Sequence, residues 1–211
     1  MGNRSEHGIL VVKSGPMGGD KTEYLIDHHG DESLAFIPDV DWRSDDGLRS
    51  HNGTVVTENV FTLPADNPGE LFQKFGKRLQ SGEITSVEFD ETNFWGQALI
   101  AVVKELTAMG VAVYAAGLLL DSDLEDIGPT RELAMIADHC IEAFADCDDE
   151  DCEAPAVYNY FKGEKEDQVV VGAWELYGAS CPDHYNGFRE QYDLEPLPDK
   201  IVFSDVWEVK K

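Results

Sequence analysis

The segment Gly15 to Thr22, GPMGGDKT, has the spacing of a phosphate-binding loop. Such a loop needs backbone N–H groups that converge on phosphates, a lysine that reaches the outer phosphates, and a hydroxyl for magnesium where the next helix begins. Lys21 and Thr22 occupy the last two places. Asp20 replaces the glycine before the lysine, so a carboxylate faces the nucleotide and a side chain restricts the backbone. The motif therefore predicts nucleotide binding that Asp20 weakens or abolishes.

A second candidate site is the acidic pair Asp90 and Glu91, which ends the apolar run VEFDE. One acid of such a pair can hold magnesium while the other accepts a proton from a hydroxyl. In a chain with 42 acidic residues a pair is weak evidence by itself. Its place at the end of a strand downstream of the loop makes phosphoryl transfer the chemistry that it favours.

Three cysteines and one histidine form two short-spaced pairs, Cys147-x4-Cys152 and Cys181-x2-His184. Two such pairs can present four ligands tetrahedrally, which is the closed geometry of structural zinc. Disulfides are the competing interpretation, but the N-terminus has no signal-peptide pattern and the second pair has no disulfide explanation. We expect Cys140, within a helical pattern, to be a small core residue.

Strands alternate with helices through the first two-thirds of the chain, which predicts an α/β fold with a mostly parallel sheet flanked by helices. Short apolar runs and helical spacings give the expected elements. The strands are Ile9 to Lys13, Ser33 to Ile37, Val87 to Asp90 and Val111 to Ala116, and the helices are a segment from near Thr22, Gly69 to Leu79, Ala98 to Met109 and Thr130 to Phe144. Further β-like runs lie near 157–161 and 168–171.

We expect three parts along the 211 residues. Residues 1–146 form the nucleotide-binding α/β domain of the P-loop, RecA-like type, residues 147–190 a small zinc-held lasso subdomain, and residues 191–211 a C-terminal extension. No apolar run approaches the ~18 residues that a membrane span requires. The expected location is cytoplasmic.

The charge balance is strongly acidic, with 42 acidic against 16 basic residues and a formal charge of -26. This charge should repel nucleic acids and anionic membranes, so neither is an expected partner. The acidic residues are spread along the chain, which favours a solvated acidic surface over a partner-binding or DNA-mimicking one. A salt-rich host remains one explanation.

Several motifs in order resemble the zinc-containing thymidine kinases. GPMGGDKTEYLI resembles the family's P-loop, and DWRSDDGLRSHNG (41–53) its D-x-R loop and SH-x-G motif. FDETNF (89–94) is similar to its DE-x-Q-F stretch, and GLLLDSDLEDIGPTRELAMIAD (117–138) to its GL-x-x-DF segment. The two Cys/His pairs and VVVGAWELY (169–177) resemble its zinc ligands and lasso. The resemblance covers about residues 8 to 185.

The resemblance implies an ATP-dependent, magnesium-dependent kinase of thymidine or a related deoxynucleoside, with structural zinc and a homo-oligomeric assembly, either a tetramer or a dimer. It implies that Glu91 is the base for the nucleoside 5′-hydroxyl. The implied cofactor-binding residues are Gly15, Met17, Gly18, Gly19, Asp20, Lys21, Thr22, Arg43, Asp90 and Asn93. The implied nucleoside-binding residues are Phe94, Leu118, Val170 and Tyr177, and the metal ligands are Cys147, Cys152, Cys181 and His184.

Departures from the family pattern motivate an alternative. Besides Asp20, the family's DF phenylalanine is Ser122 and the usual basic residue after it is Asp123. Asn93 occupies the position of the family's common glutamine. Asn159 and Phe161 occupy positions where the family's lasso usually has threonine and arginine. The alternative is a catalytically impaired, thymidine-kinase-like protein that binds nucleosides or acts as an acidic interaction protein.

Overall fold

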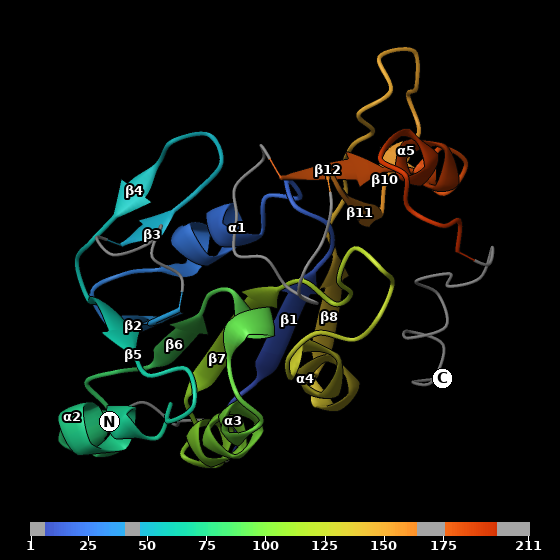
Figure 1. The fold of residues 1–211 in the computed structure, drawn as a ribbon. Helices are drawn as coiled ribbons and strands as arrows, with labels where there is room; N and C mark the ends of the chain where they lie inside the picture. The colour runs from blue at the N-terminus through green and yellow to red at the C-terminus, as the bar shows by residue number, and fades with distance from the viewer. Residues whose placement is uncertain (1–6, 41–46, 164–175, 198–211) are drawn as a thin grey trace.

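A six-stranded parallel sheet forms the centre of the molecule (Figure 1). The computed structural model describes residues 7–40, 47–163 and 176–197. Along the sheet the strand order is β5-β2-β6-β7-β1-β8. The strands are β1 (Leu10–Ser14), β2 (Ser33–Pro38), β5 (Val60–Leu63), β6 (Ser86–Phe89), β7 (Ala112–Gly117) and β8 (His139–Glu142). Because every neighbouring pair is parallel, the carboxyl ends of all six strands lie at one edge.

Helices cover both faces of this sheet. They are α1 (Lys21–His28), α2 (Glu70–Ser81), α3 (Ala98–Ala108) and α4 (Thr130–Ile136), and a fifth, α5 (Tyr185–Gln191), lies outside the sheet. Alternation along β2 separates the two cores: Leu34 and Phe36 face the core shared with α2, α3 and α4, whereas Ala35 and Ile37 face Leu25 of α1. The α/β fold class predicted from the alternating pattern is confirmed.

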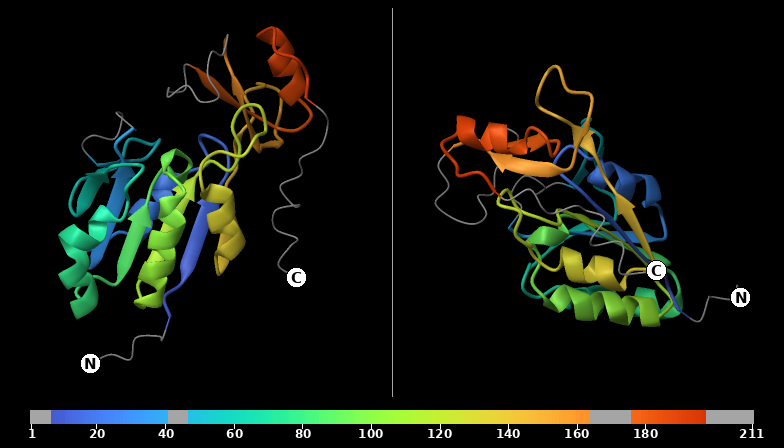
Figure 2. Two further views of the ribbon diagram at one scale, coloured as in Figure 1. Left: turned by 60° about the horizontal axis from the view of Figure 1, so that its bottom comes forward. Right: turned by 90° about the vertical axis from the view of Figure 1, so that its right-hand side faces the viewer.

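A smaller subdomain stands beyond the carboxyl edge of the sheet, as the left view of Figure 2 shows. It contains β9 (Ala145–Asp146) paired with β10 (Pro155–Ala156), and β11 (Tyr158–Phe161) paired with β12 (Tyr177–Ser180). Helix α5 packs on β11, where the rings of Tyr160 and Phe188 are stacked with centroids 4.5 Å apart. A hairpin of β3 (Leu48–Arg49) and β4 (Val55–Val56) lies beside α1.

The helix expected over Thr130 to Phe144 is wrong in its second half. Helix α4 ends at Ile136, and residues His139–Glu142 form the edge strand β8, which pairs with β1. The side chain of Asp138 fixes this change of direction, because its carboxylate accepts the backbone N–H of Leu10 at 2.8 Å. Cys140 therefore lies on a strand, half-buried, and its thiol donates to the carbonyl of Ala134.

The other expected elements of the sheet domain are confirmed to within one or two residues. The β-like run near 157–161 is β11, while the run at 168–171 lies outside the described residues. Within residues 7–40, 47–163 and 176–197, no helix is both long enough and apolar enough to cross a membrane.

Candidate active site and metal centre

The loop between β1 and α1 is packed tightly against the end of β8. A Cβ atom on Gly15 would lie 2.1 Å from the carbonyl oxygen of Ala143, and one on Gly19 would lie 2.9 Å from the Ala143 side chain. Real Cβ atoms do not approach backbone so closely, so both positions accept glycine alone. The loop is thus held in shape by the neighbouring strand before any ligand binds.

Asp20 caps the start of α1 in the left-handed conformation, with φ 47° and ψ 38°. Left-handed φ and ψ values are unrestricted for glycine and are tolerated by aspartate and asparagine at a modest cost. The side chain makes no capping hydrogen bond and is exposed. The chain therefore keeps the backbone shape of a glycine loop while presenting a carboxylate beside the phosphate position.

Lys21 lies across the mouth of the loop, where its ammonium donates to the carbonyl oxygen of Pro16. Burial of this ammonium lowers the pKa of Lys21 to about 8, although the nearby carboxylates of Glu91 and Asp90 oppose the shift. A buried cation beside these carboxylates is suited to neutralising phosphate charge.

The Thr22 hydroxyl contacts Asp90, at 3.0 Å from Oδ2 and 3.2 Å from Oδ1. Asp90 follows β6 and is 4 % exposed. A hydroxyl and a carboxylate in contact at the start of a P-loop helix form a hard-oxygen donor set that suits Mg²⁺. The two residues predicted to hold magnesium therefore lie together.

Glu91 adopts a left-handed backbone, with φ 47°, between β6 and the short 3-10 helix Thr92–Phe94. Its backbone N–H donates to Asp90 Oδ1 at 2.9 Å, and the indole of Trp95 donates to the Asp90 carbonyl at the same distance. Non-glycine residues in such conformations cluster at functional sites because the surroundings must hold them there.

Asn93 ties this short helix to β7. Its Oδ1 accepts the backbone N–H of Leu118 at 2.8 Å, and a Cβ on Gly117 would lie 2.9 Å from the same oxygen. The buried Nδ2 has no hydrogen-bond partner among the described residues. Phe94, at the end of the helix, is half-buried. Asn93 thus acts on loop geometry in this structure.

A narrow hollow lies between the loop, the segment after β7, and β11, and in this structure it has no room for even a water molecule. Its lining comprises Gly15, Pro16, Leu119, Leu120, Val157, Tyr158 and Asn159. The Oδ1 atom of Asn159 accepts the backbone N–H of Met17 at 2.8 Å, which joins β11 directly to the P-loop. Apolar walls with a few polar groups beside a phosphate loop are of the kind that small-ligand sites use, but this hollow must widen before it can admit a ligand.

Cys147, Cys152, Cys181 and His184 converge, and their ligand atoms all lie within 4.8 Å of one another. The Cys152 and Cys181 sulfurs are 3.7 Å apart, and His184 Nδ1 lies 3.7 Å from the Cys147 sulfur and 3.6 Å from that of Cys181. Zinc–sulfur bonds of about 2.3 Å at tetrahedral angles give edges of roughly 3.6–3.8 Å. A sulfur–sulfur bond of about 2.05 Å is far shorter. The cluster is consistent with zinc and excludes a Cys152–Cys181 disulfide.

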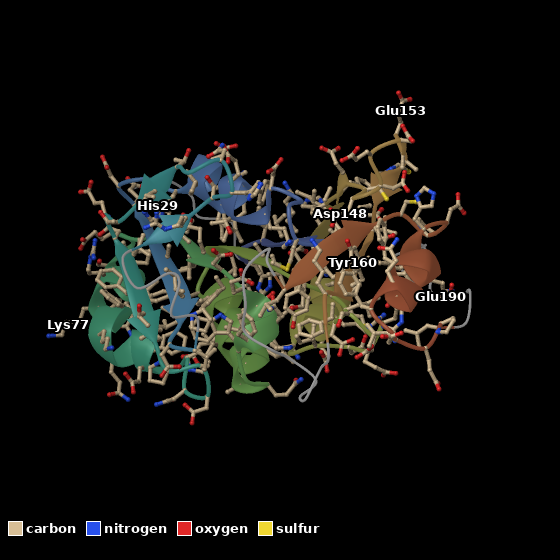
Figure 3. All side chains as sticks on the ribbon, turned by 45° about the horizontal axis from the view of Figure 1, so that its top comes forward. His29, Lys77, Asp148, Glu153, Tyr160 and Glu190 are labelled. Atoms are coloured by element: carbon tan, nitrogen blue, oxygen red, sulfur yellow. The ribbon has the colours of Figure 1, made fainter. Side chains whose placement is uncertain are left out.

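The surroundings of the cluster act in opposite directions on two of its thiols, since burial raises the pKa of Cys181 to about 11. Burial raises the pKa of Cys147, but backbone N–H groups of Cys181 and Asp149 and the His184 ring outweigh burial and bring that pKa down to about 7. Nearby, the hydroxyl of Tyr160 donates to Asp148 at 2.7 Å (Figure 3). This contact anchors the segment that carries Cys147 to β11.

The predicted residues separate into two groups in space. The P-loop residues, Asp90, Glu91 and Asn93 meet at the carboxyl edge of the sheet, and the four metal ligands meet in the subdomain. Leu118 follows β7 beside Asn93, and Tyr177 lies on β12 with its ring 5.1 Å from that of Phe161. Arg43 and Val170 lie outside the described residues.

Two features of the site are not predicted from the sequence: the lining residues Leu119, Leu120 and Tyr158, and the link from Asn159 to Met17. The apolar run 118–120 directly after a strand was the available signal for Leu119 and Leu120. No local pattern signals the link, because Met17 and Asn159 are separated by 142 residues.

Comparison with known proteins adds an independent result. A family model described as "Thymidine kinase" matches residues 8–185. Proteins named thymidine kinase from two strains of Porphyromonas gingivalis are each 28% identical over 201 residues, which covers 92% of this chain and 93% of the relative. A protein of the same name from Ureaplasma urealyticum is 26% identical over 190 residues, covering 84% and 82%.

Proposed function

This chain belongs to the thymidine kinase family, and we propose that it transfers the γ-phosphoryl group of ATP to the 5′-hydroxyl of thymidine or a closely related deoxynucleoside. The observation that carries this proposal is the contact of Thr22 with Asp90 beside Lys21 and Glu91. A P-loop lysine, a magnesium-binding pair and a carboxylate base are the parts that phosphoryl transfer needs.

The residue roles follow from their positions. Lys21 and the loop amides neutralise charge on the phosphoryl group, and Thr22 and Asp90 would hold magnesium, which would supply further positive charge against the phosphates. Glu91 orients the nucleoside hydroxyl and accepts its proton. We propose that the hollow lined by Leu119, Leu120 and Tyr158, next to Leu118, widens to receive the nucleoside.

One observation favours a second candidate function. Asp20 presents an exposed carboxylate at the loop, in a conformation that glycine adopts without cost. Repulsion between this carboxylate and phosphate weakens ATP binding. A family member that binds nucleosides but transfers phosphate poorly is therefore the alternative.

The experiment that tests the proposal is phosphorylation of a panel of deoxynucleosides with ATP and magnesium. Thymidine should be among the best acceptors, and Glu91→Gln should lower kcat by about 10²–10⁴-fold, the usual contribution of a general base. Glu105→Gln, which removes an exposed carboxylate on α3, is the matched control and should keep full activity. Equal rates for the Glu91 and Glu105 variants would show that Glu91 is not the general base. An absence of ATP binding at millimolar concentration would favour the alternative, a family member that binds nucleosides but transfers phosphate poorly.

The metal centre is proposed to hold one structural zinc per chain. Elemental analysis of the purified protein should find one equivalent, and Cys181→Ser should lose it. An intact, folded protein without zinc would refute this assignment.

From membership of the thymidine kinase family, we also propose that the protein is a cytoplasmic homo-oligomer. Within the chain, we propose that residues 1–146 form the catalytic domain, residues 147–190 the zinc subdomain and residues 191–211 a C-terminal extension.

A further inference from the structure

The segment from Gly117 to Gly128, between β7 and α4, rises from the sheet toward the zinc subdomain (left view of Figure 2). It supplies Leu119 and Leu120 to the hollow. We call this segment the wall loop. Its turn is organised by Asp121, whose Oδ1 accepts the backbone N–H groups of Asp123 at 2.8 Å and Glu125 at 3.0 Å.

The wall loop contains a strained residue. Leu124 has φ 62°, a left-handed conformation that costs a leucine free energy and persists only where surrounding contacts enforce it. Its side chain is 9 % exposed and belongs to a small apolar core with Leu119, Tyr158 and Tyr185. Part of that core therefore comes from α5, so the C-terminal helix is among the elements that enforce the turn.

Arg189 of α5 makes the direct connection. It is 5 % exposed, and its NH1 group donates to the carbonyl oxygen of Ser122 and to Asp123 Oδ1, each at 2.8 Å. The hydroxyl of Tyr185 donates to the same Ser122 carbonyl at 2.6 Å. The Nε of Arg189 is held in turn by the carbonyl of Glu195 at 2.8 Å. A buried guanidinium with three fixed acceptors is pre-organised and expensive to displace.

The ion pair joins two segments that lie far apart in the sequence. Position 123, where the family pattern usually has a basic residue, is an aspartate here, and its positive partner is supplied from α5. Arg189 lies four residues beyond the end of the match to the family model at residue 185, but within the span aligned with the Porphyromonas gingivalis relatives, which covers 92% of this chain.

Helix α5 also begins at the metal centre. His184 is the N-terminal cap of α5 and one of the four clustered ligands. One turn of helix separates this ligand from Arg189, so the metal centre and the guanidinium share a rigid element.

We propose that Arg189 is a positioning residue that holds the wall loop against the nucleoside hollow, so that nucleoside affinity depends on α5. The identity of the ligand in that hollow rests on the proposed function. The bond to the Ser122 carbonyl and the ion pair to Asp123 fix the turn, and the turn fixes Leu119 and Leu120. ATP contacts none of these residues in the proposed site, so its binding is independent of Arg189.

Steady-state kinetics provide the first test. Arg189→Met should raise KM for thymidine by about tenfold or more while KM for ATP stays within about twofold. Arg189→Lys, which keeps the charge but can satisfy fewer acceptors, should fall between Arg189→Met and wild type. Arg78→Met is the matched control, because Arg78 forms an ion pair with Glu83 on the surface, far along the chain on α2. Equal rises in both KM values, or no rise at all, would overturn the proposal.

Hydrogen exchange tests the same idea without catalysis. The amides of Leu124, Glu125 and Ile127 bond within the wall loop and should exchange at least about tenfold faster in Arg189→Met, with zinc content and P-loop exchange unchanged. If Arg189→Met does not fold, Asp123→Asn removes only the ion pair and should show the same change to a smaller degree. Unchanged wall-loop exchange in these variants refutes the proposal, whereas a wild-type protein that fails to phosphorylate thymidine refutes only the proposed function.

Discussion

Asp20 differs from a glycine at the same position in two ways. Its side chain makes the left-handed backbone costly, and its carboxylate places a negative charge beside the phosphate site. Asp20→Gly removes the carboxylate from the phosphate site and the steric cost of φ 47°. We expect ATP to bind about tenfold more tightly, since a unit charge and a doubly charged nucleotide complex, taken as about 6 Å apart in a water-like dielectric, repel by about 1.4 kcal/mol. Titration of an ATP analogue in the presence of magnesium measures the change.

Asp20→Asn is the control that assigns the cause. Asparagine tolerates the left-handed conformation as aspartate does but carries no charge. If repulsion dominates, the asparagine variant should bind ATP nearly as tightly as the glycine variant. Affinity in Asp20→Asn equal to wild type, with tighter binding in Asp20→Gly, would instead identify backbone strain.

Lys21 gives the site a pH dependence. Because burial lowers its pKa to about 8, the ammonium loses its proton as pH rises through that value, and its attraction for phosphate is lost with it. ATP affinity should therefore fall between about pH 7 and pH 9. In Lys21→Met the affinity should be weaker and nearly flat over this range. A wild-type affinity that stays constant to about pH 9 would show that bound phosphate raises the lysine pKa out of the range.

At the residue scale, the sequence predicts the site residues that belong to recognisable motifs. It does not predict residues whose contacts form only when distant segments of the chain come together. Lys21, Thr22 and Asp90 follow from loop spacing and from an acid at a strand end, and the structure brings them into contact. Arg189 and Asn159 have no local pattern that marks them, because their partners lie 66 or 67 and 142 residues away. Their contacts exist only after the sheet and the subdomain have come together.

At the scale of elements, His29 joins the end of α1 to the sheet. Its Nδ1 lies 3.1 Å from Oε2 of Glu88 on β6, and its Nε2 lies 2.7 Å from the carbonyl oxygen of Glu58 before β5 (Figure 3 labels His29). The Glu88 side chain is fully buried, and among the described residues its carboxylate is compensated by this pair and by the hydroxyl of Ser86. The hydrogen bond to Glu88 raises the pKa of His29 above its ordinary value of 6.5.

A pH-dependent stability follows from this raised pKa. Protonated His29 contributes stability that is fully present below about pH 6.5 and is lost as pH rises through the higher pKa of the folded state. Urea unfolding at several pH values should show wild type losing free energy of unfolding above about pH 6.5 relative to His29→Gln. Parallel pH curves for the two proteins would exclude His29 as the source.

The helix expected over residues 130–144 is the expected element of the sheet domain that was wrong, and it shows a limit of predicting secondary structure from hydrophobic periodicity. Residues 130–144 place apolar side chains at helical spacing, but His139–Glu142 pair as β8 with β1, a strand 128 residues earlier. Short apolar runs satisfy both the helical and the strand period, and the sheet decides between them. Three of the strands that the sequence predicted correctly, β1, β2 and β7, have glycine or proline at or near their ends, which restricts the alternatives.

At the scale of the whole molecule, 42 acidic against 16 basic residues make self-repulsion a general destabilising force. Salt screens this repulsion, so thermal stability should rise with sodium chloride, most steeply below about 0.15 M where the Debye length exceeds about 8 Å. Thermal melts over about 0.01–1 M sodium chloride measure the effect. A melting temperature that is constant or falls over this range would show that the acidic groups are locally compensated or well separated.

Gly15 and Gly19 have no room for a side chain because Ala143 fills it, and this is true with or without a nucleotide. Packing alone therefore requires glycine at these two positions, whether or not the loop binds ATP. Position 20 faces no such packing constraint, since its side chain is exposed. The two glycines are thus no evidence of nucleotide binding by themselves, and position 20 is the more informative residue of the loop.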